Sequence, residues 1–400
     1  MSHRLLTIAF LASLLGCSGL AAQTTSCGST KLICLFPTAF HTNPPTFNFF
    51  NEAFATQIGQ LSLATPASGF ILTFDKQTRV YTATQESFGP LVAERAETLG
   101  RHRAYLAFTF QRMVFSEIDG NSLSNLPILF FYPNKPSAKV ATYTQNFISA
   151  NVNQYVIYGT YGLTSRLDVS VAIPFLRVSM GSTTGGTEYS TTTPATTSFS
   201  QDISGSASGI GDAIFAAKGT VYKTDKYGIA VGGELRVPSG DEQNFLGSGA
   251  VGIKPYIVFS RRGRVAPHIN LAYQWNSSSP LAVGADGKQG PLPPYFGYIL
   301  GADVGVSKRL TLAADFVGQH YFNAALLTTT QDTSAVVNNQ QVSFSSIAPA
   351  FGSYNLNALA LGLKANPWKQ MLILANITIK VNDGGLRATV VPFVGISYTF

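Results

Sequence analysis

Apolar and polar residues alternate with a period of two along most of the chain from residue 101 to the carboxyl terminus. Side chains of a strand point alternately to opposite faces, so each of these segments has one apolar face and one small or polar face. The pattern predicts twelve strands, at residues 101–115, 142–161, 166–180, 209–222, 227–237, 250–260, 264–276, 295–306, 308–322, 354–365, 369–381 and 386–400.

The connections between these strands alternate in length. The short ones are 162–165, 223–226, 261–263, 307 and 366–368, the long ones are 116–141, 181–208, 238–249, 277–294 and 323–353, and the last outer connection, 382–385, is short. Bacterial outer-membrane barrels have even strand numbers, short periplasmic turns and longer external loops. The fold expected is therefore all-β, a closed antiparallel transmembrane β-barrel of about twelve strands that starts and ends in the periplasm.

Charged residues fall on the small or polar face of the predicted strands. In 227–237, for example, Tyr227, Ile229 and Val231 oppose Glu234 and Arg236. A charge that faces lipid at the bilayer midplane costs about 2–4 kcal/mol, so these charges are expected to face the barrel interior. The interior set predicted in this way is Asp168, Asp212, Lys218, Glu234, Arg236, Lys254, His268, Asp303, Asp315, Lys364 and Lys380.

Two interpretations of this interior set are open. Charges of both signs can pair across a narrow barrel and fill it as a stabilising core. They can also line a pore with hydrogen-bond donors and acceptors. The two interpretations are compatible.

Two of the long connections differ in composition. Residues 181–208 are rich in Ser, Thr and Gly and have few groups that could bury a core, so a flexible surface loop is expected there. Residues 323–353 are more apolar and could form a hairpin above the membrane or fold into the barrel mouth.

The amino terminus has the features of a secretory signal. Arg4 precedes an apolar run that is too short to span a bilayer as a helix, and small residues follow, so cleavage is expected after Ala22. The sequence before Cys17 also resembles a lipoprotein cleavage box. We therefore divide the chain into a signal peptide (1–22), a periplasmic or plug segment (23–100) and an outer-membrane barrel (101–400).

Within the second segment, the sequence predicts a short helix at 48–61 with Phe50, Phe54 and Ile58 on one side, and a hairpin at 69–85. The arms of this hairpin are short for membrane-spanning strands of about 9–11 residues. The segment is thus a periplasmic extension, a plug inside the barrel, or the source of two further wall strands that would make fourteen.

Cysteine usage fits an oxidising compartment. Cys17 leaves with the signal peptide, and the remaining pair, Cys27 and Cys34, is expected to form a small disulfide loop, with packed free thiols as the alternative. No His/Cys cluster with metal-ligand spacing lies nearby, and no metal or cofactor is expected.

The last strand ends on an aromatic residue at the carboxyl terminus. Phe400, Tyr398, Ile396 and Val394 share one apolar face. This ending resembles the terminal strand of bacterial outer-membrane barrels, which the barrel assembly machinery reads as a signal. The resemblance implies that Tyr398 and Phe400 direct assembly.

Three internal motifs add a more specific resemblance. They are G-L-T-S-R-L-D-V-S-V-A-I-P-F at 162–175, S-G-I-G-D-A-I-F-A-A-K at 208–218 and G-G-E-L-R-V-P-S-G at 232–240. With them, the chain resembles, over roughly residues 95–400, the outer-membrane barrel family named after the meta-pathway of phenol degradation. The resemblance implies a transporter connected with aromatic compounds.

Composition narrows the function. Charged residues are only 12% of the chain, and the formal charge of +7 comes partly from basic residues at predicted turns, which argues against nucleic-acid binding. No phosphate loop, zinc motif or nucleophile elbow marks an enzyme. The function expected is an outer-membrane channel or transporter for small compounds, including hydrophobic or aromatic ones. The alternative is a closed structural or surface-interaction barrel. Its partners would be outer-membrane lipid, the assembly machinery and a small solute.

Overall fold

The computed structural model of the chain describes residues 30–39, 48–59, 72–75, 80–83, 87–132, 140–190, 196–283, 288–337, 340–368 and 370–400. The predicted signal peptide, Cys17 and Cys27 lie outside these residues. Cys34 is buried, and its disulfide with Cys27 stays a prediction. Among the described residues, no helix has the length and apolarity needed to cross a membrane.

Strands make up most of the described chain. The strands are β1 (Leu72–Asp75), β2 (Val80–Ala83), β3 (Ala104–Ile118), β4 (Asn121–Ser122), β5 (Leu126–Tyr132), β6 (Val140–Gly162), β7 (Leu167–Ser190), β8 (Thr196–Ile210), β9 (Ala213–Lys223), β10 (Tyr227–Val237), β11 (Gly252–Arg261), β12 (Val265–Asn276), β13 (Ser278–Val283), β14 (Gln289–Pro291), β15 (Tyr295–Ser307), β16 (Leu310–Val337), β17 (Gln340–Trp368), β18 (Met371–Lys380), β19 (Leu386–Ala388) and β20 (Val390–Thr399). The helices are η1 (Leu32–Cys34), α1 (Leu35–Ala39), α2 (Asn48–Gly59) and η3 (Glu242–Asn244).

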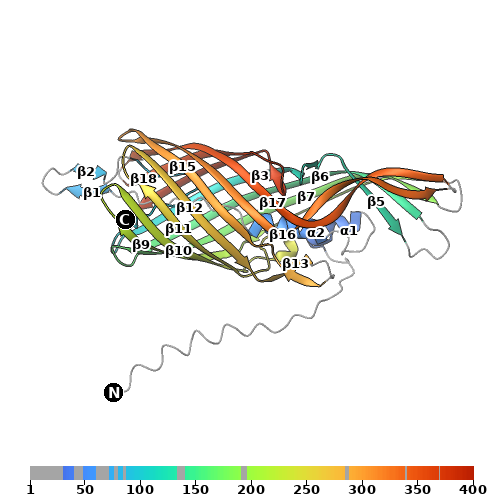
Figure 1. The fold of residues 1–400 in the computed structure, drawn as a ribbon, viewed down its shortest axis with the longest axis horizontal. Coiled ribbons are helices and arrows are strands. Elements are labelled where there is room, and N and C mark those ends of the chain that lie inside the picture. The colour runs from blue at the N-terminus through green and yellow to red at the C-terminus, as the bar shows by residue number, and fades with distance from the viewer. Residues whose placement is uncertain are drawn as a thin grey trace, which may run out of the picture.

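Twelve of the described strands close into one antiparallel barrel (Figure 1). Their order is β3, β6, β7, β9, β10, β11, β12, β15, β16, β17, β18 and β20, and β20 then pairs with β3. The predicted twelve-stranded barrel is confirmed. The predicted last strand is divided, because β19 and β20 are separate strands that both pair with β3.

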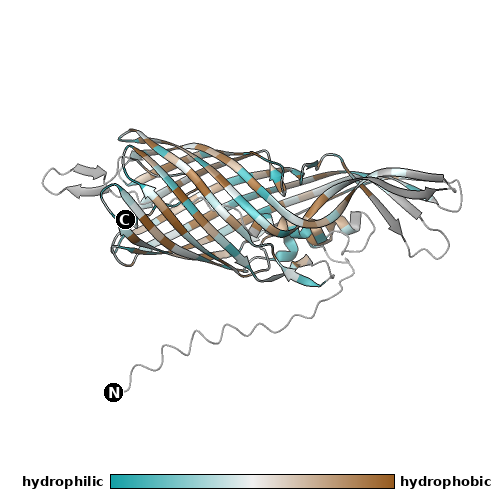
Figure 2. Cartoon of the chain, viewed as in Figure 1, coloured by the Kyte–Doolittle hydropathy of each residue, from teal (hydrophilic) through white to brown (hydrophobic). Residues whose placement is uncertain are grey.

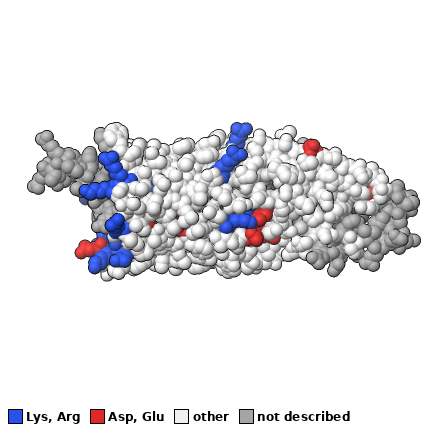
Figure 3. All heavy atoms as spheres, turned by 90° about the horizontal axis from the view of Figure 1, so that it is seen from above, with Lys and Arg blue, Asp and Glu red and all other residues white. Residues whose placement is uncertain are grey.

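The wall shows its apolar face outward. Hydrophobic and less hydrophobic residues alternate along the strands (Figure 2), and Ile157, Trp275 and Phe400 are 60%, 52% and 63% exposed. On the face seen in Figure 3, Lys and Arg gather at one end of the barrel and again nearer the middle, with little charge between them. An apolar belt on a closed barrel satisfies the backbone internally and presents hydrocarbon to lipid, as a membrane-spanning barrel requires.

The two ends of the barrel differ. One end, which we call the turn end, carries short connections such as 224–226 and 262–264, together with the carboxyl terminus and the β1–β2 hairpin (Figure 1). The other end, the hairpin end, carries extensions of β6, β7, β16 and β17 that reach far beyond the wall. Short turns are periplasmic in bacterial barrels, so the hairpin end faces outward from the cell.

The flexible loop expected at 181–208 is wrong. β7 continues to Ser190, and β8 pairs with it from Phe175↔Ile210 to Tyr189↔Thr196. The low apolar content excludes a buried core but not a strand, because β7 is already held by β6 and offers its second edge for backbone pairing. The wall strand predicted at 209–222 consequently begins at Ala213 as β9, after a break at residues 211–212.

Residues 323–353 form the hairpin that was one of the two alternatives, since β16 and β17 stay paired out to Val337↔Gln340. The fourteen-stranded alternative is wrong. Among the described residues, β1 and β2 pair only with each other and form a separate two-stranded sheet. Four-residue arms are too short to span the membrane.

Helix α2 lies at the barrel mouth of the hairpin end, and the helix predicted at 48–61 is confirmed. Phe50, Phe54 and Ile58 are buried in the largest apolar cluster of the described chain. The ring of Phe54 lies 6.0 Å from that of Phe115, which faces inward from β3. Burial of three large apolar side chains, at roughly 1.5–3 kcal/mol each, holds the helix in the mouth.

Candidate functional site

Residues 87–99, which precede β3, lie inside the barrel near the turn end and form what we call the inserted segment. It has no helix or strand in the structure, so its backbone amides need other partners. Inward-facing side chains of the wall supply them. Asp315 Oδ2 accepts from the amides of Leu91 (2.9 Å) and Val92 (2.8 Å), and Asp168 Oδ2 accepts from the amide of Leu99 (2.8 Å).

A fully buried charge network holds the middle of the inserted segment. Arg95 Nη2 lies 2.5 Å from Asp303 Oδ2, which also accepts from Ser87 Oγ. His268 bridges the wall carboxylates, with Nε2 2.8 Å from Asp315 Oδ1 and Nδ1 3.4 Å from Asp303 Oδ1. Buried charges are tolerated when they are paired and hydrogen-bonded in this way.

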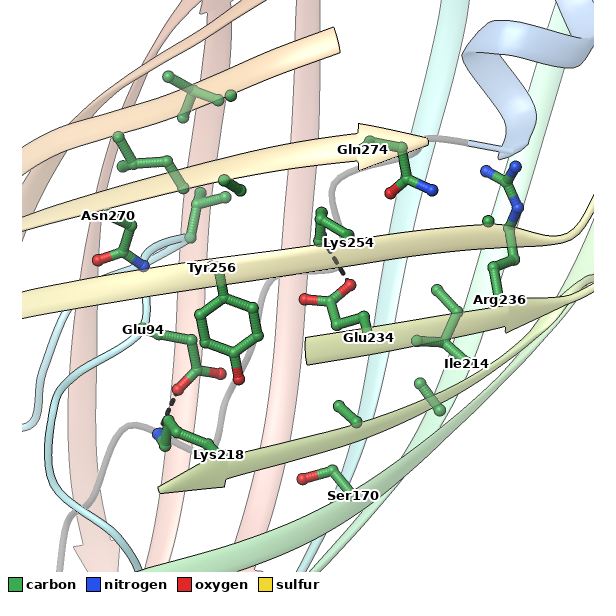
Figure 4. A pocket seen from close by; sticks show the side chains of 18 of the residues that line it. Glu94, Ser170, Ile214, Lys218, Glu234, Arg236, Lys254, Tyr256, Asn270 and Gln274 are labelled. Carbon is green, nitrogen blue, oxygen red and sulfur yellow. Dashed lines mark hydrogen bonds and ion pairs between the residues drawn. The ribbon is translucent and has the colours of Figure 1, made fainter. Parts of the chain in front are cut away.

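Two further ion pairs join the inserted segment to the wall. Lys218 Nζ lies 2.5 Å from Glu94 Oε2 (Figure 4), and Arg262 Nε lies 2.5 Å from Glu97 Oε1. Buried Lys364 faces the same interior, paired in register with Thr311, whose hydroxyl accepts from the amide of Phe88 (2.9 Å). Predicted wall charges therefore meet partners that come from the inserted segment.

Between this segment and the wall lies a cavity of about 160 Å³, which we call the central chamber. Glu234 and Lys254 form an ion pair at 2.6 Å on its surface (Figure 4), and each side chain is 24% exposed. Its lining carries three acidic and three basic side chains, which balance: Glu94, Asp168, Glu234, Lys218, Arg236 and Lys254.

Tyrosine rings form much of the remaining lining of the central chamber, and glycines make room for two of them. A Cβ at Gly232 would lie 2.3 Å from Tyr256 Cζ, and one at Gly318 would lie 2.1 Å from Tyr298 Cζ. Each ring therefore lies against a neighbouring strand where no side chain stands. This placement keeps the two rings close to the wall and leaves the chamber open.

A second cavity of about 110 Å³, the mouth-side chamber, lies between the inserted segment and α2. Gln57 of α2 and Asn376 of β18 contribute to its lining. Lys380 also lines it, bonded to Glu117 and, at 2.9 Å, to Asp383.

Asp212 serves a different part of the barrel from the chamber residues. Its carboxylate accepts from the Ser248 amide (2.8 Å) and hydroxyl (2.5 Å) and from the Gly240 amide (3.2 Å), which fixes the loop after β10. Arg236 Nε lies 3.8 Å from Asp212 Oδ2, and Arg236 Nη2 donates to Asn276 at 2.8 Å.

Helix α2 is fastened to the wall at the mouth. Glu52 Oε1 accepts from the amide of Ala325 on β16 at 3.0 Å, and burial raises the pKa of this carboxyl to about 7. Asp119, beside the mouth, accepts from the amides of Leu327 and Gly385 at 2.8 Å each, and burial likewise raises its pKa.

Sequence reasoning missed the partners on the inserted segment, Glu94, Arg95 and Glu97. The only sequence signal was a group of charges just before the first wall strand, in a stretch without period-two alternation. Nothing in that stretch specifies contacts with wall residues more than a hundred positions away.

The closed barrel with its apolar belt and chambered interior places the chain among bacterial outer-membrane β-barrels of the channel class. A family model described as "Putative MetA-pathway of phenol degradation" matches residues 134–344, and the chain belongs to that family. The resemblance found in the sequence is thus confirmed.

Solved structures similar to the chain are also outer-membrane channels. An outer membrane channel from Pseudomonas putida F1 is 12% identical, with a TM-score of 0.46, over 76% of this chain and 98% of that chain. A mutant of the TodX monoaromatic hydrocarbon channel is 10% identical, with a TM-score of 0.35, over 76% and 92%. A Pseudomonas aeruginosa FadL homologue is 8% identical, with a TM-score of 0.31, over 74% and 89%. No curated protein sequence matches the chain.

Proposed function

We propose that the protein is a passive outer-membrane channel for small, largely uncharged compounds, and that residues 23–100 act as its plug. The observation that carries this proposal is the central chamber, which lies inside the barrel between the wall and the inserted segment. A stabilising core alone would leave no such space, because protein interiors are packed to crystal-like density.

The same contacts support a transport role rather than catalysis for the interior charges. Asp168, Asp303 and Asp315 bind amides or side chains of the inserted segment, which fixes the shape of the passage. The charges that face the central chamber balance, so the chamber has no net preference for cations or anions. Diffusion of neutral solutes through it requires no cofactor.

Liposome swelling with the purified, folded protein tests the proposal. Vesicles that contain the barrel should swell in iso-osmotic solutions of small neutral solutes at rates that fall with solute size. Vesicles with an equal mass of heat-denatured protein serve as the control. Equal swelling rates in both preparations would reject the channel.

One observation favours the alternative of a closed surface-interaction barrel. The paired extensions of β6, β7 and β8 and of β16 and β17 project well beyond the wall at the hairpin end (Figure 1). Removing residues 328–346 shortens the second extension while keeping its pairing with the wall. Under the channel proposal this variant keeps its swelling rate, whereas a barrel that acts only through its extensions never swells vesicles.

A further inference from the structure

The two chambers are adjacent and share part of their lining. Val92, Val317 and Gln319 line both of them. Val92 belongs to the inserted segment, and its amide donates to Asp315 of the wall at 2.8 Å. The backbone of Val92 is therefore fixed across from Val317, and this point is the narrow passage between the chambers.

Each chamber also contains a polar side chain that is more than nine-tenths buried and has no hydrogen-bond partner in the described structure. In the central chamber it is Tyr158, 5% exposed, through its hydroxyl. In the mouth-side chamber it is Asn376, 6% exposed, through both amide atoms. Unpaired buried polar groups are destabilising, so a molecule that supplies their hydrogen bonds is favoured at these two places.

Size and charge limit what that molecule can be. A cavity of roughly 150 Å³ holds one benzene ring, and the central chamber has a volume of about 160 Å³. Its three acidic and three basic side chains leave no net charge to attract an ion. The rings of Tyr256 and Tyr298 lie against the wall and offer flat apolar surface.

We propose that the two chambers are successive binding sites for a neutral, single-ring compound that carries a hydroxyl group. In this proposal Asn376 and Tyr158 bind the hydroxyl in turn, and Val92 forms the constriction between the two sites. The inference rests on the proposed channel function and adds to it the class of solute and the residues that select it.

Fluorine NMR titrations of the detergent-solubilised barrel test the two sites. The probes are 4-fluorophenol, fluorobenzene and 4-fluorobenzoate, which share a ring and differ in the polar group. Removing one hydrogen bond lowers affinity by about three- to tenfold. We expect Tyr158→Phe and Asn376→Leu each to weaken binding of 4-fluorophenol by this factor and to leave fluorobenzene unchanged. Wild-type protein should bind 4-fluorobenzoate more weakly than 4-fluorophenol.

The matched control is Tyr155→Phe. Tyr155 lies on the same strand as Tyr158 but faces outward and is 37% exposed, so this variant also corrects for partition of the probes into detergent. Heat-modifiable migration in electrophoresis confirms that each variant is folded. If folded Tyr158→Phe and Asn376→Leu both bind 4-fluorophenol as the control does, the proposed sites are wrong.

Flux measurements in proteoliposomes test the constriction. Val92→Ala should raise phenol flux and Val92→Trp should abolish it, while both variants keep the affinity of the outer site at Asn376. Unchanged flux in both variants would overturn the role of Val92. Swelling by neutral solutes without any effect of these substitutions rejects this proposal but not the channel. Ligand binding without any swelling rejects the channel and retains the binding sites.

Discussion

Glu234 and Lys254 form an ion pair on the surface of the central chamber, with Lys254 Nζ 2.6 Å from Glu234 Oε2 and each side chain 24% exposed. A pair in contact with an open cavity keeps part of its hydration. Its loss should therefore cost less than the roughly 3–5 kcal/mol typical when one partner of a fully buried pair is removed. Arg95 and Asp303, by contrast, are 3% and 0% exposed and belong to the fully buried type.

Glu234→Ala leaves the central chamber with two acidic and three basic side chains. We expect ion selectivity to shift toward anions while the heat-modifiable, folded fraction stays near that of the wild type. Reversal potentials in planar bilayers under a salt gradient measure the shift. Asp225→Ala removes the same charge at an exposed turn and is the control. Unchanged selectivity combined with a large loss of folded protein would show that the pair belongs to a dry structural core.

Glu52 provides a pH-dependent contact between α2 and β16. The pKa of its carboxyl is about 7 in the folded protein, against 4.5 for a glutamate in water, so the folded state binds the proton more tightly. Docking of α2 is therefore most stable below pH 4.5 and weakens as the pH rises from 4.5 to 7, by at most about 1.4 kcal/mol per pH unit. Above pH 7 the contribution is constant.

Hydrogen–deuterium exchange of residues 48–59 measures this effect. Wild-type exchange, corrected for the intrinsic pH dependence of amide exchange, should accelerate between pH 4.5 and 7. Glu52→Gln cannot ionise and should show a flat corrected rate. A flat corrected rate in the wild type as well would contradict the role of Glu52.

At the scale of elements, the inserted segment is the part of the chain whose position was hardest to foresee. Strands such as 227–237 could be predicted with their boundaries, because lipid outside and charge inside impose a period of two on every wall position. The stretch from Ser87 to Leu99 carries no such period. Its place is determined by individual contacts, such as Arg95 with Asp303 and Glu94 with Lys218, which connect distant parts of the sequence.

Sequence patterns also left the picture of the wall charges incomplete. Their common inward face followed from alternation, and the structure places Lys254 beside Glu234 on adjacent strands. Asp212 and Asp315 have partners that alternation does not reveal, because their oxygens accept from backbone amides of a loop and of the inserted segment. Backbone donors leave no trace in residue type.

Arg95→Leu should loosen the inserted segment. It removes the cation next to Asp303 and leaves a buried carboxylate with less compensation, at a cost of about 3–5 kcal/mol in the docking of the segment. We expect a larger single-channel conductance and faster exchange of amides 87–99. Arg101→Leu, an exposed position beyond the segment, is the control. Faster exchange with unchanged conductance would show that the segment does not limit the passage.

At the scale of the whole molecule, closure of the barrel depends on its last strand. β20 pairs with β18 on one side and with β3 on the other, so the ring is complete only when this strand is in place. Phe400 is 63% exposed at the turn end, its amide donates to Ala104 at 2.8 Å, and its ring lies 4.8 Å from that of Tyr398. The terminal aromatic pair therefore stands on the outer surface next to the seam.

From this placement we expect Tyr398 and Phe400 to be read by the barrel assembly machinery before the seam closes. Deleting Phe400 removes one seam hydrogen bond and the exposed ring, which is a small loss among the many backbone pairs of the wall. The folded barrel should therefore keep its stability once formed, while the fraction that reaches the membrane in heat-modifiable form falls severalfold. Refolding of the truncated chain into detergent in vitro is the control and should proceed with wild-type yield. Wild-type insertion in cells would show that the terminal aromatic residue is not the signal, and failure in vitro as well would assign its role to folding rather than to recognition.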